Sequence, residues 1–193
     1  METEKRVFIA MELNSVHREN LKESQRRLAK DLEKGHIVPE ENFHMTLAFL
    51  GEQNADAMHR ILDAMVEVAV KTPIFLTYMG NLGEFSFPKG DTYFMGIRST
   101  KELLLLEESL KDALGRRGFS IEERPFHPHI TLVKKGKLLP QSEGLVSMNE
   151  KSHMPKLPIL VDKLILFESI EDGEGTRYEP LHVEPLVAKR QEV

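Results

Sequence analysis

A short pattern that occurs twice constrains this sequence more than any other feature. His44-Met45-Thr46-Leu47 recurs as His129-Ile130-Thr131-Leu132, so each copy reads histidine, apolar residue, threonine, leucine. In a β-strand, alternate side chains point to the same face. Each copy therefore predicts a strand that buries its apolar pair and presents its histidine and threonine together on the other face.

The spacing of apolar residues and the capping residues predict a mixture of strands and helices along the whole chain. We expect strands at 7–13, 43–50, 74–79, 92–97, 129–133, 159–169 and 176–183. Helices are expected from about 15 to 33, between Asn54 and Pro73, from Thr100 to about Gly115, and at 141–150. This order predicts an α+β fold with mainly antiparallel sheets. No low-complexity linker divides the chain, so we expect one domain over residues 1–193.

Several segments are expected to be irregular. Gly35 is predicted to end the first helix, and the Gly/Phe/Pro-rich segment 80–90 is predicted to be a loop. The lysine-rich run 134–137 is most simply a solvated turn, although a role against an RNA backbone stays open. The polar tail beyond Ala188 is expected to fray.

Composition excludes several classes of protein. There is no cysteine, which excludes disulfide frameworks, thiolate catalysis and cysteine-ligated metal sites. The 26 Lys and Arg residues against 31 Asp and Glu residues give a net charge of −5, which argues against a general nucleic-acid coat protein. We find no signal peptide and no apolar run long enough to span a bilayer, so we expect a cytoplasmic protein without a membrane partner.

Two histidine–threonine pairs that face each other have a clear chemical use. Histidine titrates near neutral pH, so one copy can be neutral while the other is protonated. Such a pair provides a general base and a general acid in one cleft. The threonine hydroxyls can donate to phosphate oxygens, so the site suits displacement at phosphorus without a metal or another cofactor.

The paired His-x-Thr-x motifs resemble those of the two-histidine (2H) phosphoesterases, and the chain looks most like the RNA 2′,3′-cyclic phosphodiesterases, also called the 2′-5′ RNA ligase family. The resemblance covers most of the chain in the right order. The segments that carry it are Arg6–Ala10, Pro39–Gly51, Pro125–Leu132 and Leu166–Ser169, followed by Gly175 and Tyr178.

The resemblance implies two pseudo-symmetric lobes around a central cleft, with one motif from each lobe. It also implies hydrolysis of a 2′,3′-cyclic phosphate at an RNA end to a 2′-phosphate. His44 would be the proton donor, His129 the proton acceptor, and Thr46 and Thr131 the residues that hold the phosphate. The reverse reaction, which forms a 2′-5′ linkage, is implied as well. No obligate protein partner is evident.

One position departs from the family pattern. The family often has an arginine soon after the second motif, and Lys134 stands there in this sequence. Lysine supplies the charge but not the bidentate fork of arginine. Strict alternation would also point Lys134 away from the cleft and Lys135 into it, unless the strand bulges.

Other residues have both functional and structural interpretations. The chain has no tryptophan, so the candidates for base stacking are Phe85, Phe87, Tyr93 and Phe126, of which the first two are more simply packing residues. His127 and His129 could form half of a metal site, but no carboxylate partner is evident.

Two other functions stay open at this point. The cleft could bind a nucleotide without turnover, although arginine or lysine would serve that purpose as well as two histidines. The protein could also be a 2H enzyme for a different small phosphodiester, because the motifs contact only the phosphate. The charge balance predicts that RNA is held locally at its end, so that binding depends only modestly on salt.

Overall fold

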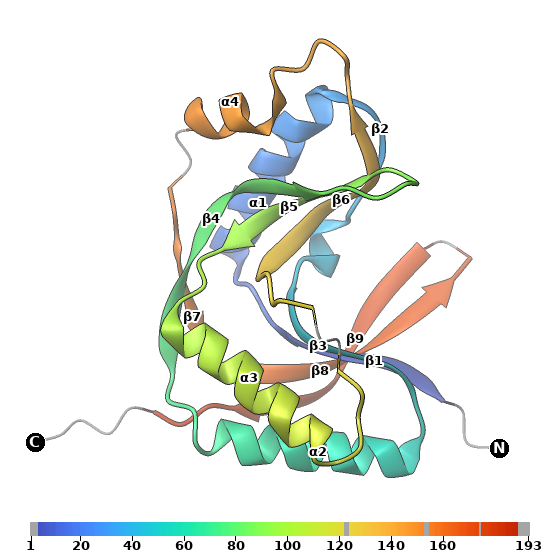
Figure 1. Cartoon of the computed structure of the whole chain (residues 1–193), viewed down its shortest axis with the longest axis vertical. Coiled ribbons are helices and arrows are strands. Elements are labelled where there is room, and N and C mark those ends of the chain that lie inside the picture. The colour runs from blue at the N-terminus through green and yellow to red at the C-terminus, as the bar shows by residue number, and fades with distance from the viewer. Residues whose placement is uncertain (1–3, 122–123, 153–154, 174, 189–193) are drawn as a thin grey trace, which may run out of the picture.

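The computed structural model describes residues 4–121, 124–152, 155–173 and 175–188. It is an α+β structure with two antiparallel sheets, each covered by helices on one face (Figure 1). The predicted fold class is therefore confirmed. In the part of the chain that the structure describes, no helix is long and apolar enough to cross a membrane.

The first sheet has four strands in the order β3-β1-β8-β9. Its strands are β1 (Lys5–Met11), β3 (Met45–Gln53), β8 (Lys163–Asp172) and β9 (Gly175–Pro185). Two helices pack beneath this sheet and against each other, α2 (Ala55–Ala69) and α3 (Lys101–Gly115) (Figure 1). Together these elements form one lobe.

The second sheet has five strands in the order β2-β6-β5-β4-β7. Its strands are β2 (Leu32–Ile37), β4 (Phe75–Phe85), β5 (Asp91–Ile97), β6 (His129–Leu138) and β7 (Pro158–Val161). Helix α1 (Ser15–Lys30) packs against β2 and β6, and α4 (Gly144–Glu150) packs against β4. A short 3₁₀ helix, η1 (Glu40–Asn42), leads into β3.

The two lobes are built from interleaved segments of the chain. Helix α1 follows β1 of the first sheet but packs on the second sheet, and α3 follows β5 of the second sheet but packs beneath the first (Figure 1). Several connections therefore cross between the lobes. This interleaving explains why the sequence shows no linker between them.

Three of the four predicted helix starts are confirmed by capping hydrogen bonds, whereas α4 begins at Gly144 without a side-chain cap. The side chain of Asn14 accepts from the backbone N–H of His17 at 3.0 Å, and that of Asn54 accepts from Ala57 at 2.9 Å. Thr100 caps α3 in the same way. Each cap pairs one of the backbone donors that a helix leaves open at its first turn.

The predicted end of the first helix is wrong. The helix stops at Lys30, and Leu32–Ile37 forms the outer strand β2, which pairs with β6. Gly35 is not a helix cap but allows the close approach of these two strands. A Cβ at Gly35 would lie 2.7 Å from Val133 and 3.1 Å from the Gly136 backbone.

Three further predictions are wrong at element boundaries. Strand β4 continues to Phe85, so the expected loop at 80–90 is half strand. The expected single strand 159–169 breaks at Asp162 into β7 and β8, which belong to different sheets. Strand β6 continues to Leu138, so the lysine run 134–137 lies in a strand and not in a turn. The tail beyond Ala188 lies outside the described residues.

Candidate active site

The two predicted histidines have the same local geometry, one in each lobe. His44 lies immediately before β3 and His129 begins β6. Nδ1 of His44 lies 2.7 Å from the carbonyl oxygen of Asn42, and Nδ1 of His129 lies 2.6 Å from that of His127. In both copies the ring is held by the carbonyl two residues earlier in the chain.

This contact determines which ring nitrogen carries the proton when the imidazole is neutral. A carbonyl oxygen only accepts, so Nδ1 must donate to it. Nε2 then keeps its lone pair and can accept a proton. In His44, Nε2 lies 3.0 Å from the Thr46 hydroxyl, which donates to it in the neutral state. Both histidines are therefore oriented with Nε2 as the reactive atom.

Aromatic side chains enclose each histidine. The rings of Phe8 and Tyr178 both have their centroids 4.8 Å from that of His44. The ring centroids of Phe85 and Phe94 each lie 5.1 Å from that of His129. These rings replace water around the imidazoles, so the charged form of each histidine loses solvation.

The enclosure lowers the pKa of both histidines. Burial is the main cause for His44, whose pKa falls from 6.5 to about 4, with further lowering by the positive charges of Lys134, His129 and Arg18. Burial also lowers the pKa of His129, and His127 adds to the effect. Both side chains are consequently neutral at pH 7 in the free protein.

This lowering makes the stability of the fold depend on pH. The unfolded chain protonates His44 below pH 6.5, whereas the folded protein does so only near pH 4. The stabilisation by neutral His44 is therefore complete above pH 6.5 and is lost as the pH falls toward 4. We expect His44 to contribute a loss of about 3 kcal/mol over this interval. Urea unfolding at several pH values measures it, and H44N should show a flatter dependence. Equal slopes for the two proteins would contradict the burial of His44.

The repeated motif includes a β-bulge that the sequence pattern alone does not show. In β3 the register against β1 shifts between Thr46 and Ala48, and in β6 the register against β5 shifts between Thr131 and Val133. Two consecutive residues then point into the core, and the next residue returns to the cleft side. That next residue is Phe49 in the first copy and Lys134 in the second.

The bulge in β6 decides between the two lysines after the second motif. Lys134 lines the cavity that also contains His44, Thr46 and Thr131. Lys135 is not among the lining residues and adopts a left-handed backbone conformation with φ of 51°. The bulge therefore brings Lys134, and not Lys135, to the cleft.

Two joined cavities form the candidate site. The smaller has a volume of about 250 Å³ and contains His44, Thr131 and Lys134, and the larger, of about 690 Å³, contains His129. Thr46 and Phe49 line both, so the two cavities meet at the first motif. All five predicted site residues thus lie along one continuous cleft between the lobes.

A buried glutamine supports the second motif from behind. The side-chain amide of Gln25 on α1 donates to the carbonyl oxygens of Val38 and Leu132, both at 2.8 Å. Leu132 lies in the bulge between Thr131 and Lys134. The carbonyl oxygen of Leu132 also accepts from the backbone N–H of Val38 at 2.9 Å, so the Gln25 amide adds a link from α1 to a contact that β6 already makes with the residue after β2.

The aromatic residues around the histidines are only partly predictable from the sequence. Phe8, Phe94 and Tyr178 come from three different strands, and their proximity to the motifs follows from strand order and not from spacing along the chain. Tyr178 and Phe8 fall in segments that carry the family resemblance, which is the one signal that could have indicated them.

The four candidates for base stacking separate into two groups. Tyr93 is 1% exposed, so it belongs to the core and cannot stack on a base. Phe85, Phe87 and Phe126 line the larger cavity, where Phe87 is 49% exposed. Phe49, exposed to a similar degree, lies in both cavities with the Arg6 guanidinium 5.1 Å from its ring centroid.

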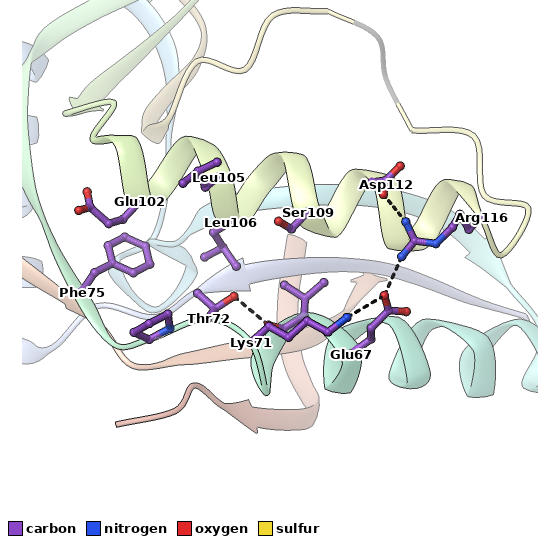
Figure 2. Close-up of a pocket in the computed structure, with 12 residues that line it drawn as sticks. Glu67, Lys71, Thr72, Phe75, Glu102, Leu105, Leu106, Ser109, Asp112 and Arg116 are labelled. Carbon is purple, nitrogen blue, oxygen red and sulfur yellow. Dashed lines mark hydrogen bonds and ion pairs between the residues drawn. The ribbon is translucent and has the colours of Figure 1, made fainter. Parts of the chain in front are cut away.

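A third cavity, of about 670 Å³, lies between α2 and α3 on the far side of the first sheet (Figure 2). Its floor is apolar, and four of its charged lining residues, Glu67, Lys71, Asp112 and Arg116, form ion pairs with one another. Glu67 accepts from Arg116 at 2.7 Å, and Lys71 lies 3.5 Å from the same carboxylate oxygen. No histidine is among its lining residues, and the ion pair between Glu67 and Arg116 connects α2 to the end of α3.

No group of three or more histidine, aspartate or glutamate side chains in the described ranges is arranged to hold a metal ion. His127 lies beside His129 in the sequence, but its carbonyl and not its ring contacts the neighbouring imidazole.

Comparison with known proteins places the chain in a family. The family model described as the 2′-5′ RNA ligase superfamily matches residues 8–173. An RNA 2′,3′-cyclic phosphodiesterase of Thermotoga maritima is 29% identical over 178 residues, which cover 92% of this chain and 93% of the relative. A protein of the same name from Geobacillus stearothermophilus is 30% identical over 185 residues. That alignment covers 93% of this chain but only 57% of the relative.

The fold of the chain also matches that of a solved structure. The crystal structure of Escherichia coli LigT complexed with 3′-AMP matches with a TM-score of 0.73 and 26% identity, covering 95% of this chain and 98% of LigT. The match of the family model spans both motifs and most of both sheets. The chain therefore belongs to the 2′-5′ RNA ligase superfamily.

Proposed function

We propose that this protein hydrolyses 2′,3′-cyclic phosphate ends of RNA to 2′-phosphate ends by general acid–base catalysis without a metal. The observation that carries the proposal is the pair of histidines, one from each lobe, which line one cleft and share the contact of Nδ1 with the carbonyl oxygen two residues earlier. Relatives named RNA 2′,3′-cyclic phosphodiesterase support it. So does the binding of 3′-AMP by LigT, because a nucleotide with a phosphate on its ribose resembles the product.

The reaction assigns one proton transfer to each histidine. His129 Nε2 accepts a proton from water as the water oxygen attacks phosphorus. The bond between phosphorus and the 3′ oxygen breaks, and protonated His44 donates its Nε2 proton to that oxygen. The product carries a 2′-phosphate and a 3′-hydroxyl. Each transfer of this kind contributes about 10²–10⁴-fold to the rate.

Thr46, Thr131 and Lys134 would bind the non-bridging phosphate oxygens. In the free protein the Thr46 hydroxyl donates to neutral His44. Protonation makes Nε2 a donor, which frees the Thr46 proton for a phosphate oxygen. The negative phosphate would also offset the positive charge of Lys134. Substrate binding would therefore raise the pKa of His44 and favour the protonated form that the reaction needs.

The bulge predicts different outcomes for the two neighbouring lysines. We expect K134A to lower kcat/KM by roughly tenfold or more, because it removes the cation that faces the phosphate. K135A is the matched control and should stay within about twofold of the wild type. Steady-state hydrolysis of a cyclic-phosphate oligonucleotide measures both. A larger loss in K135A would mean that Lys135 supplies the charge.

The same site could also catalyse the reverse type of reaction, ligation. If the 5′-hydroxyl of a second RNA replaces water, attack on the cyclic phosphate forms a 2′-5′ linkage and expels the same 3′ oxygen. We include this reaction in the proposal, together with RNA ends as the partner. A cytoplasmic location also belongs to it, supported by the absence of cysteine.

The test is an incubation of the protein with a short RNA that ends in a 2′,3′-cyclic phosphate, in the presence of EDTA. We expect complete conversion at a rate independent of the chelator. Binding without turnover, measured by calorimetry, would instead make the cleft a nucleotide-binding module. An absence of both turnover and binding would indicate that the motifs act on a different phosphodiester.

A further inference from the structure

We propose that β2 and β6 form a basic surface that binds the phosphate backbone of single-stranded RNA, on the nucleotides upstream of the reacting end. The inference rests on the proposed function and deepens it. It concerns the residues that extend outward from the cleft and that the reaction at phosphorus does not use.

The surface consists of basic residues placed opposite each other on two neighbouring strands. In the register between the two strands, Lys34 pairs with Lys137 and His36 pairs with Lys134. We call these four residues the β2–β6 ladder. Side chains at opposite positions have Cβ atoms about 5 Å apart, and two lysines placed there, as Lys34 and Lys137 are, repel each other.

Few of these charges are neutralised within the protein. Lys137 pairs with Glu33 at 2.7 Å. Lys34 and Lys134 have no carboxylate within ion-pair distance anywhere in the described ranges, and both side chains are exposed. The whole chain carries a net charge of −5, so this concentration of unpaired cations is local and not a general property of the surface.

The ladder is continuous with the candidate active site. Lys134 belongs to both, and Val38, which follows β2, lines the same cavity. Residues two apart in a strand are about 6.6 Å apart, which is close to the spacing of successive phosphates in an extended single strand. A phosphate chain that leaves the cleft at Lys134 can therefore pass His36 and Lys34 in turn. Its continuity with a phosphate site favours RNA over an acidic peptide.

The experiment compares a 2′,3′-cyclic mononucleotide with a tetranucleotide that ends in the same group. In the wild type, kcat/KM should be at least tenfold higher for the tetranucleotide. Its logarithm should fall with log salt at a slope of about −2, as expected for about three phosphate contacts to a single strand. The mononucleotide should show a slope shallower by at least one.

The variant K34E tests the ladder itself, and K101E is the matched control, an exposed lysine at the start of α3 in the other lobe. We expect K34E to lower the ratio of the two kcat/KM values at least tenfold and to make the tetranucleotide slope shallower. K101E should leave the ratio unchanged. An unchanged ratio in K34E, or equal salt slopes for the two substrates, would overturn the proposal.

Failure of the proposed function would be visible separately, as an absence of hydrolysis of either substrate. In that case, fluorescence anisotropy with a labelled single-stranded tetranucleotide still tests the ladder. Binding that K34E abolishes and K101E preserves would support it, and binding insensitive to K34E would overturn it. A polyglutamate peptide that competes as well as RNA would assign the surface to an acidic protein and contradict the proposal.

Discussion

H44A and H129A are each expected to lower kcat for a cyclic-phosphate oligonucleotide by roughly 10²–10⁴-fold, with little change in KM. In the proposed mechanism, each variant removes one proton transfer at Nε2, while the threonines and Lys134 would still hold the phosphate. The double variant should lose little more kcat than the more damaging of the two single variants, because the acid and the base act together in one step.

The matched control for these variants is H59A. His59 is exposed on α2, away from the cleft, and should retain full activity. H44N and H129N keep a polar side chain of similar size in each aromatic enclosure, and urea unfolding shows whether they fold normally. A folded variant at either position that keeps more than about a tenth of wild-type kcat would contradict the assigned roles.

The dependence of kcat/KM on pH is expected to peak in the acidic range, below pH 6.5. This profile reports the pKa values of the free protein. The pKa of His44 is about 4 there, and that of His129 lies below 6.5. One histidine must be protonated and the other neutral, so the active fraction is largest between the two values. Above pH 6.5, kcat/KM should fall by about tenfold per pH unit.

The profile of kcat should be shifted to higher pH than that of kcat/KM. It reports the complex, in which the bound phosphate anion favours protonation of His44. Measuring both profiles with one oligonucleotide separates these effects. A kcat/KM maximum at or above pH 7.5 would show that the aromatic rings do not lower the histidine pKa values, and coincident profiles would show that the phosphate does not act on His44.

The candidate site was largely predictable because its signal is local. His44 with Thr46 and His129 with Thr131 are two residues apart in extended backbone at the start of a strand, so alternation alone places each pair on one face. The helix caps Asn14, Asn54 and Thr100 are local signals of the same kind, and they are confirmed.

The remaining features depend on contacts between segments that are distant in the sequence. The bulge that brings Lys134 into the cleft arises from the register of β6 against β5, which alternation within one strand cannot show. Strand β2 looked like a helix end because its pairing partner lies about a hundred residues later. The break at Asp162 follows from β7 and β8 joining different sheets, and no apolar pattern encodes that choice.

The most direct measurement of the central claim is the identity of the product. Phosphorus NMR of an oligonucleotide with a 2′,3′-cyclic phosphate, after complete turnover in EDTA, distinguishes a 2′-phosphate from a 3′-phosphate. The account predicts the 2′-phosphate alone, because protonated His44 can reach only one leaving oxygen in a fixed cleft. A 3′-phosphate, or a mixture of the two, would contradict it.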